Sequence, residues 1–128
     1  MKRRSLLLAS AASVASARAI AAPNVIQLVY VGGRDCPACA EWVRDTRPRF
    51  LASSLYKKVR YVEIETAKMR AAYDVSNWPD DLVTTLHNLP HKSGTPRFLI
   101  VMNGQLYANE LGRWNRTVSY LRELIAIA

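Results

Sequence analysis

The hydrophobic pattern of the chain predicts alternating strands and helices. Continuous apolar runs rich in β-branched residues predict buried strands, and apolar residues at helical spacing predict helices with one buried face. The predicted strands cover residues 24–31, 59–64, 97–102 and 105–111. The predicted helical segments cover residues 40–55, 67–73, 80–89 and 117–127. The order β-α-β-α-α-β-β-α predicts one α/β domain with a central mixed sheet of about four strands flanked by helices.

Several residues mark the ends and faces of these elements. Pro48 should kink the first helix or end it early, because proline lacks the backbone N–H that a helix interior needs. Asn103-Gly104 predicts a two-residue hairpin turn between the last two strands. Apolar positions at helical spacing predict inward faces in the last two helices, at Leu82, Leu86 and Leu89 and at Val118, Leu121, Leu124 and Ile125.

The first 21 residues are typical of a cleavable export signal. A basic start, Met1–Arg4, precedes an apolar run of small residues, and A-x-A sites allow cleavage after Ala19 or Ala21. The apolar run is too short to span a membrane, which takes about 20 residues. A weak membrane anchor and an ordinary tail remain as alternatives. We expect a mature domain over residues 22–128 in the periplasm, exported by the Sec route or, given Arg3-Arg4, the Tat route.

The charge of the chain is partly explained by this leader. The sequence has 18 Lys and Arg against 10 Asp and Glu, a net charge of +8. Four of the basic residues lie in the first 22 positions, and the remaining 14 against 10 leave +4. No basic stripe interleaved with aromatic residues is present, so we expect no nucleic-acid partner.

Cys36 and Cys39 are the only cysteines and have C-x-x-C spacing. They lie where the first strand, followed by Gly32-Gly33, gives way to a helix. A helix N-terminus carries free N–H groups and a partial positive charge, which stabilise a thiolate, the nucleophilic form of cysteine. Pro37 suits the first helical turn, where a missing N–H costs nothing.

This arrangement predicts thiol–disulfide exchange without a cofactor. Cys36, nearer solvent, is the expected nucleophile that forms a mixed disulfide with a substrate, and Cys39 is the expected resolving cysteine. We expect Pro37 and Ala38, between the cysteines, to contact the substrate. Run in reverse, the same pair would donate a disulfide, as an oxidase or isomerase does, and the sequence does not fix the direction.

Two other uses of the cysteine pair remain open. The pair can form a structural disulfide, although so small a loop constrains the unfolded chain little. It can also bind Cu(I) or zinc, with His87 or His91 as additional ligands. Pro90 interrupts any helix that joins these histidines, and no clear ligand set follows, so we expect no metal site.

Gly94-Thr95-Pro96 directly precedes the third strand. A proline there belongs at a strand start or a bend, since it cannot donate to the sheet. The Thr95–Pro96 bond is either trans, as most X–Pro bonds are, or cis, which would turn the preceding backbone toward the strand–helix junction.

The combined motifs resemble the thioredoxin superfamily over nearly all of residues 22–128. The resemblance rests on C-x-x-C after the first strand, T-P before a hairpin with N-G, a glycine after that hairpin and a terminal helix. It implies a thioredoxin fold, a cis bond before Pro96, and a Thr95 backbone that pairs with a bound substrate strand. It also implies redox roles for Cys36 and Cys39.

A narrower resemblance is to the SoxS-type periplasmic thioredoxins of bacterial sulfur-oxidation systems. It is carried by C-x-x-C-x-x-W at 36–42, Pro48, Phe50, W-P-D-D-L at 78–82 and T-P-x-F-L at 95–99. It implies reduction of disulfides or mixed disulfides on a sulfur-carrier protein. The partners expected are therefore a protein disulfide substrate and a membrane or periplasmic electron donor, with the chain itself a monomer.

The sequence departs from the thioredoxin pattern beside the cysteines. Asp35 stands where thioredoxins usually carry tryptophan, and its negative charge would disfavour a Cys36 thiolate. Tyr30 replaces the buried carboxylate six residues before the first cysteine, so the proton acceptor for Cys39 is not identified. We expect Glu41 and Asp45 to be solvated. Asp35, Trp42 and Trp78 are candidate supports of the site, and we expect the two tryptophans to pack between elements.

Overall fold

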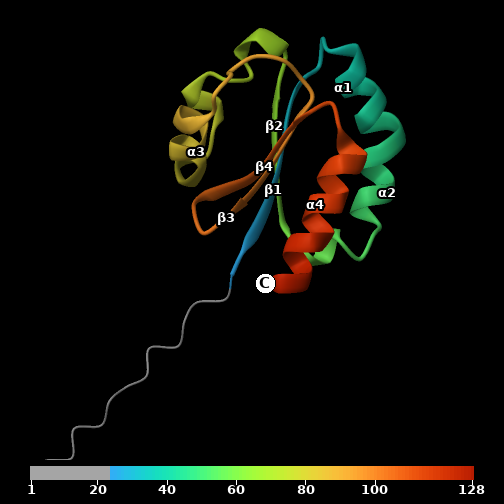
Figure 1. Cartoon of the computed structure of the whole chain (residues 1–128). Coiled ribbons are helices and arrows are strands. Elements are labelled where there is room, and N and C mark those ends of the chain that lie inside the picture. Colours follow the sequence, from blue (N-terminus) through green and yellow to red (C-terminus); the bar gives the residue numbers. More distant parts are fainter. Residues whose placement is uncertain (1–23) are drawn as a thin grey trace, which may run out of the picture.

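A four-stranded sheet forms the centre of the protein in the computed structural model, which describes residues 24–128 (Figure 1). Its strands run in the order β2-β1-β3-β4, with β1 parallel to β2 and antiparallel to β3, and β3 antiparallel to β4. The predicted signal peptide, residues 1–21, lies outside the described residues. The strand bounds are β1 Ile26–Gly33, β2 Arg60–Thr66, β3 Arg97–Met102 and β4 Gln105–Leu111.

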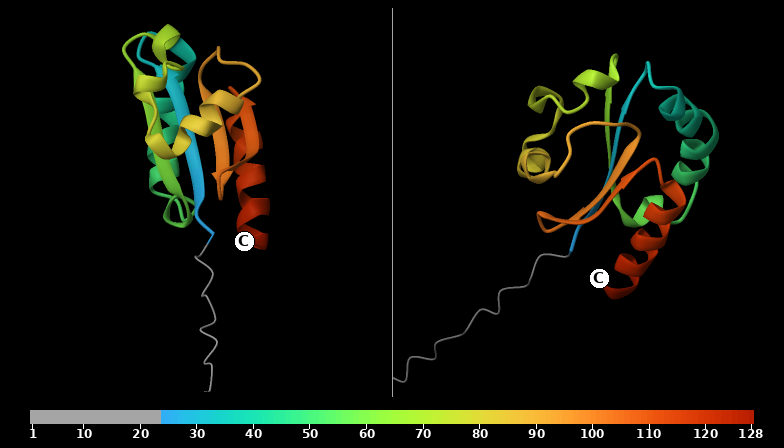
Figure 2. Two further views of the ribbon diagram at one scale, coloured as in Figure 1. Left: turned by 90° about the vertical axis from the view of Figure 1, so that its left-hand side faces the viewer. Right: turned by 45° about the horizontal axis from the view of Figure 1, so that its top comes forward.

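Helices cover both faces of this sheet (Figures 1 and 2). One face carries α1 (Pro37–Glu41), α2 (Arg47–Leu51) and α4 (Trp114–Ile127), and the other carries α3 (Val83–Asn88). The predicted α/β class and order of elements are confirmed, and the arrangement is compatible with a thioredoxin-like fold. Within residues 24–128, no helix is both long enough and apolar enough to cross a membrane.

The alternation of side chains along β1 divides the core between these two faces. Val29 and Val31 pack with residues of α3, whereas Leu28 packs with residues of α2 and α4. The predicted apolar face at Leu82, Leu86 and Leu89 is buried. In α4, Leu121 and Leu124 are buried and Val118 and Ile125 are half-buried, as predicted.

The first helical segment differs from the prediction at both ends. It begins at Pro37 rather than Ala40, and it ends at Leu51 rather than Leu55. It also continues through Pro48, because a π-helical turn at Trp42–Thr46 precedes the proline. There the N–H of Arg47 bonds to the carbonyl of Trp42, five residues back. This wider turn separates the proline ring from the carbonyl with which it would collide in a regular helix.

The helix predicted over residues 67–73 is replaced by 3₁₀ turns at Met69–Ala71 and Val75–Asn77. Gly33 explains the close docking of this segment, since a Cβ at that position would lie 2.6 Å from the backbone nitrogen of Met69. The turns are closed by Asn77 Nδ2 and Trp78 Nε1, which donate to the carbonyls of Ala71 and Ala72. Such side-chain bonds compete with the regular helical pattern.

The hairpin between β3 and β4 has the predicted turn. Asn103 and Gly104 both have positive φ, 53° and 75°, as a type I′ turn requires.

Candidate active site

The two cysteines form a disulfide at the start of α1, with their Cα atoms 5.2 Å apart. Cys36 is the N-cap residue, and its Sγ accepts the backbone N–H of Cys39 at 3.2 Å. Its own N–H bonds to the carbonyl of Gly33 at 3.2 Å, which fixes the turn from β1 into the helix. Pro37 occupies the first helical position, as predicted. The cysteine that the sequence indicates as nucleophile thus lies at the electropositive end of the helical segment.

The two cysteines differ only slightly in solvent exposure. Cys36 is 3% exposed and Cys39 is fully buried, while Pro37 and Ala38 between them are exposed. A partner that reaches the disulfide therefore meets Pro37 and Ala38 on the surface and Cys36 before Cys39.

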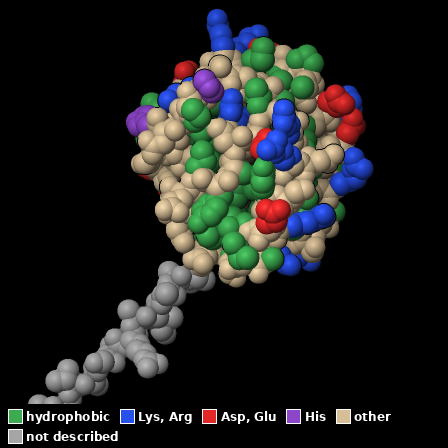
Figure 3. Space-filling model, viewed as in Figure 1, with side chains coloured by type: hydrophobic (Ala, Val, Ile, Leu, Met, Phe, Trp, Pro, Cys, Tyr) green, Lys and Arg blue, Asp and Glu red, His purple; other side chains and the backbone are tan. Residues whose placement is uncertain are grey.

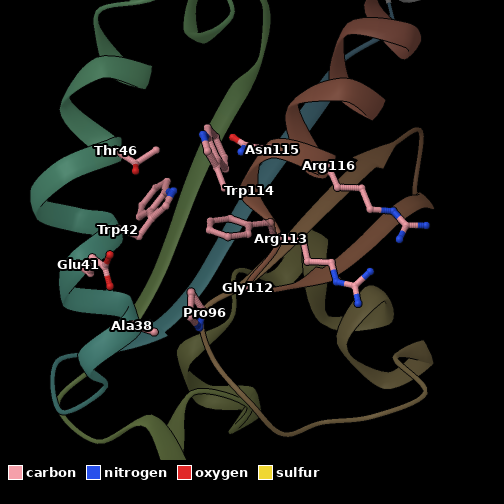
Figure 4. Close-up of a pocket in the computed structure, with 11 residues that line it drawn as sticks. Ala38, Glu41, Trp42, Thr46, Pro96, Gly112, Arg113, Trp114, Asn115 and Arg116 are labelled. Carbon is pink, nitrogen blue, oxygen red and sulfur yellow. The ribbon is translucent and has the colours of Figure 1, made fainter.

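The Thr95–Pro96 bond is cis, as the resemblance implied. Pro96 and Ala38 both line one groove of about 580 Å³ and lie near each other at one end of it (Figure 4). Three aromatic residues, Trp42, Phe98 and Trp114, form its apolar surface. Glu41 lies on the α1 side, and the remaining polar lining comes from Thr46, Arg113, Asn115 and Arg116.

The segment that carries Pro96 is held by a buried arginine. Arg97 is 6% exposed, and its guanidinium donates to Tyr73 Oη at 2.6 Å, to Asn109 Oδ1 at 2.6 Å and to the carbonyl of Ser93 at 2.7 Å. Tyr73 Oη in turn donates to the carbonyl of Gly94 at 2.6 Å. Burial raises the pKa of Tyr73 despite the arginine, so the hydroxyl keeps the proton it donates.

Sequence reasoning missed Arg97 and Tyr73. A charged residue within an otherwise apolar predicted strand was the available signal for Arg97, because arginine is rarely buried without partners.

A second cavity, of about 420 Å³, has Thr95 in its lining. Its lining includes Arg70, Lys92 and Tyr73. Thr95 Oγ1 lies 3.7 Å from Met69 Sδ. Pro96 thus lines the aromatic groove and Thr95 lines this second cavity, and both hollows have cationic side chains in their lining.

Asp35 is exposed, and its carboxylate accepts the backbone N–H of Met69 at 2.6 Å. This bond joins the turn before Cys36 to the 3₁₀ segment after β2. Asp35 thus anchors the loop that leads into Cys36.

Tyr30 is fully buried in one cluster with Cys36, Cys39, Trp42 and Phe98. Its ring stacks on Trp42, with centroids 4.6 Å apart and 18° between planes. Burial raises the pKa of Tyr30 to about 12. Neither Tyr30 Oη nor Trp42 Nε1 has a hydrogen-bond partner among the described residues.

The remaining site candidates divide between the two faces of the sheet. Trp42 packs in the core as expected and also lines the groove beside the cysteines. Trp78 also packs, but on the α3 face with Val29 and Val31, so the structure does not bring it to the disulfide. Glu41 and Asp45 are exposed, as predicted.

Among residues 24–128, no side chain joins Cys36 and Cys39 as a third or fourth ligand for a metal ion. No group of three or more His, Cys, Asp or Glu side chains that could hold a metal ion occurs in residues 24–128. His87 and His91 are exposed on α3 and the loop after it.

Comparison with known proteins does not assign the chain to a family. No family model matches it, and neither curated proteins nor solved structures give a match. The functional argument therefore depends on the residues and geometry of the site.

Proposed function

We propose that the protein is a thioredoxin-type thiol–disulfide oxidoreductase that reduces disulfides or mixed disulfides on a partner protein. The observation that carries this proposal is the position of Cys36 at the helix N-cap, where Sγ accepts the N–H of Cys39. A thiolate formed by reduction would accept the same N–H and lie at the positive end of the helix. A disulfide with a purely structural purpose needs neither this activation nor an adjacent groove.

The reaction proceeds in two exchange steps. The Cys36 thiolate attacks a substrate disulfide, one substrate sulfur leaves as a thiol, and a mixed disulfide remains on Cys36. Cys39 then attacks Cys36 Sγ, the bond to the second substrate sulfur breaks, and that sulfur leaves with the bonding electron pair and takes up a proton. The substrate disulfide gains two electrons and becomes two thiols, and the protein is left oxidised with a Cys36–Cys39 disulfide.

The two cavities support a protein segment as the substrate. A chain that crosses Thr95–Pro96 in extended form would pair with the Thr95 backbone as an added strand, as the thioredoxin resemblance implies. One apolar side chain of that segment would enter the aromatic groove between α1 and α4.

Charge favours a partner with acidic residues beside its cysteine. Arg113 and Arg116 line the groove on its α4 side, with their guanidinium groups directed away from Trp42 (Figure 4), and Arg116 pairs with Glu110 at 3.2 Å. Arg70 and Lys92 line the second cavity. On the face seen in Figure 3, Lys and Arg side chains lie at the top, in the centre and along the right-hand edge. Opposite charges at such positions speed encounter and orient the partner more than they add affinity.

The cellular setting is part of the proposal. The predicted leader supports export to the periplasm, where a monomeric protein would receive electrons from a membrane or periplasmic donor. The SoxS-type resemblance favours a sulfur-oxidation carrier as substrate. Mass spectrometry of the periplasmic protein should find an N-terminus at Ile20 or Ala22, and an intact Met1 in the cytoplasmic pool would contradict export.

The activity is tested with the reduced protein. It should reduce insulin disulfides, and Cys39→Ala should trap a partner as a mixed disulfide, whereas Cys36→Ala should trap none. If the protein catalyses disulfide formation but does not reduce insulin, its function is that of an oxidase and not of a reductase. Stoichiometric binding of copper or zinc without thiol–disulfide exchange activity would contradict the reductase and oxidase functions and favour a metal-binding role.

A further inference from the structure

Tyr30 has a buried hydroxyl without a partner in the cluster that holds both cysteines. A buried polar group that makes no hydrogen bond destabilises a protein, so such groups are rare in native structures. Here the disulfide is closed, and a disulfide sulfur is a weaker acceptor than a thiolate. Reduction would turn Cys39 into a thiol or thiolate, and a thiolate is a strong acceptor in a buried site.

The fold directs this hydroxyl toward the end of β1 that leads to Cys36. A Cβ added to Gly32 would lie 2.5 Å from Tyr30 Cζ and closer still to the hydroxyl oxygen. The Tyr30 ring therefore lies over Gly32, two residues farther along the same strand face. Only a glycine leaves room for the ring in this position.

Glu65, the register partner of Gly32 on β2, raises the pKa of Tyr30 but makes no hydrogen bond with its hydroxyl. Two other polar groups around Tyr30 are engaged or point elsewhere. Glu63, its register partner on β2, accepts bonds from Arg47 Nη1 and Tyr61 Oη, both at 2.7 Å. The indole nitrogen of Trp42 lies on the side of the ring toward Thr46 rather than Ala38 (Figure 4).

We infer that the Tyr30 hydroxyl donates a hydrogen bond to Cys39 Sγ once the disulfide opens, and that this bond activates Cys39 for the resolving step. The inference rests on the proposed function. As Cys39 attacks the mixed disulfide, its proton passes to the departing substrate sulfur, the Cys36–Cys39 bond forms and the Cys36–substrate bond breaks. Tyr30 keeps its own proton and stabilises the negative charge on Cys39 Sγ.

The chemistry of a phenol limits Tyr30 to this donor role. Its pKa of about 12 means that it is protonated at any physiological pH, so it donates and does not act as the base. Burial is the main cause of the raised value, and Glu65 and Glu63 on β2 add to it while Arg47 on α2 opposes it. Tyr30 would thus serve the reaction in a different way from a buried carboxylate, which can accept the proton.

Tyr30→Phe tests the inference, because it removes one oxygen and keeps the ring. Without the hydrogen bond, the Cys39 thiol in a Cys36→Ser background should titrate about one pH unit higher, measured by NMR of ¹³C-labelled cysteine. One unit is a tenfold change, at the lower end of what a hydrogen bond to a charged group contributes. The resolving step, followed as decay of the mixed disulfide at pH 7, should slow about threefold, because a tenfold smaller thiolate fraction is partly offset by the higher nucleophilicity of a more basic thiolate.

Tyr61→Phe is the matched control, since its hydroxyl already bonds to Glu63. It should leave the titration of Cys39 and the decay of the mixed disulfide unchanged. The oxidised Tyr30→Phe protein should be no less stable than wild type in urea, because the hydroxyl it loses makes no bond in that state.

The outcomes separate this inference from the proposed function. An unchanged Cys39 titration, or equal loss of stability in the oxidised and reduced proteins, would overturn the inference and leave Tyr30 a packing residue. The titration and the urea experiment need no turnover, so they remain decisive for Tyr30 even if the wild-type protein fails to reduce insulin.

Discussion

The carboxylate of Asp35, the residue before Cys36, accepts the backbone N–H of Met69 at 2.6 Å. The same side chain therefore has two opposing effects. It holds the turn that presents Cys36, and its negative charge disfavours a thiolate beside it.

Substitution of Asp35 can separate these effects. Asp35→Asn keeps an oxygen that can accept the Met69 N–H but removes the charge, so attack by Cys36 should become about two- to fivefold faster at low salt. Asp35→Ala removes both and should also lower the free energy of unfolding by about 1–2 kcal/mol. Stopped-flow reaction of the reduced protein with a neutral disulfide measures the first effect, and urea unfolding measures the second. Equal rates for wild type and Asp35→Asn would show that the charge is without influence.

The hydroxyl of Tyr73 links Arg97 to the segment before Pro96. Tyr73→Phe should lower the free energy of unfolding by about 1–3 kcal/mol, because it leaves Arg97 Nε and the carbonyl of Gly94 without this partner. The looser segment should raise KM for a protein disulfide more than it lowers kcat. Tyr107→Phe on the exposed edge of β4 is the control and should change neither quantity. A loss of kcat alone would contradict a positioning role for Tyr73.

Arg113 is expected to contribute to recognition of acidic substrates. Arg113→Ser should lower kcat/KM for a disulfide peptide with acidic flanks about two- to fivefold at low salt, and the difference should vanish at high salt. Arg122→Ser removes the same charge from the far part of α4, where Arg122 lines a different pocket with Phe50 and Leu55. It should have little effect. If kcat/KM falls equally in both variants, the overall charge of the protein rather than the groove attracts the substrate.

The burial of Tyr30 predicts a loss of stability at alkaline pH. Its pKa is about 12 in the folded protein and 10.0 in the unfolded chain. Below pH 10 both states keep the proton. Between pH 10 and 12 only the unfolded state loses it, so the free energy of unfolding should fall with rising pH, by about 2–3 kcal/mol from this residue. Urea unfolding of the oxidised protein should show this slope, and Tyr30→Phe should reduce it. An unaltered slope in that variant would assign the effect to the half-buried Tyr61 and Tyr73, whose pKa values burial also raises.

The sequence by itself determined the strands, the chemistry of the cysteine pair and the turns that glycine and proline dictate. These features depend on short stretches of chain. Apolar runs predicted all four strands to within two residues, and the N-G turn required positive φ whatever its surroundings. The position of Cys36 ahead of a helix followed from neighbouring residues alone.

Only the tertiary structure decided which distant residues meet at the site. A 3₁₀ segment replaced the helix that local propensity predicted over residues 67–73. This segment docks closely on β1 because Gly33 has no side chain to keep Met69 away. The bond from Arg97 to Tyr73 and the stacking of Tyr30 on Trp42 join segments whose contact no local pattern encodes. Burial is a property of the packed molecule, so only the tertiary structure decided that the Tyr30 hydroxyl is buried without a hydrogen-bond partner.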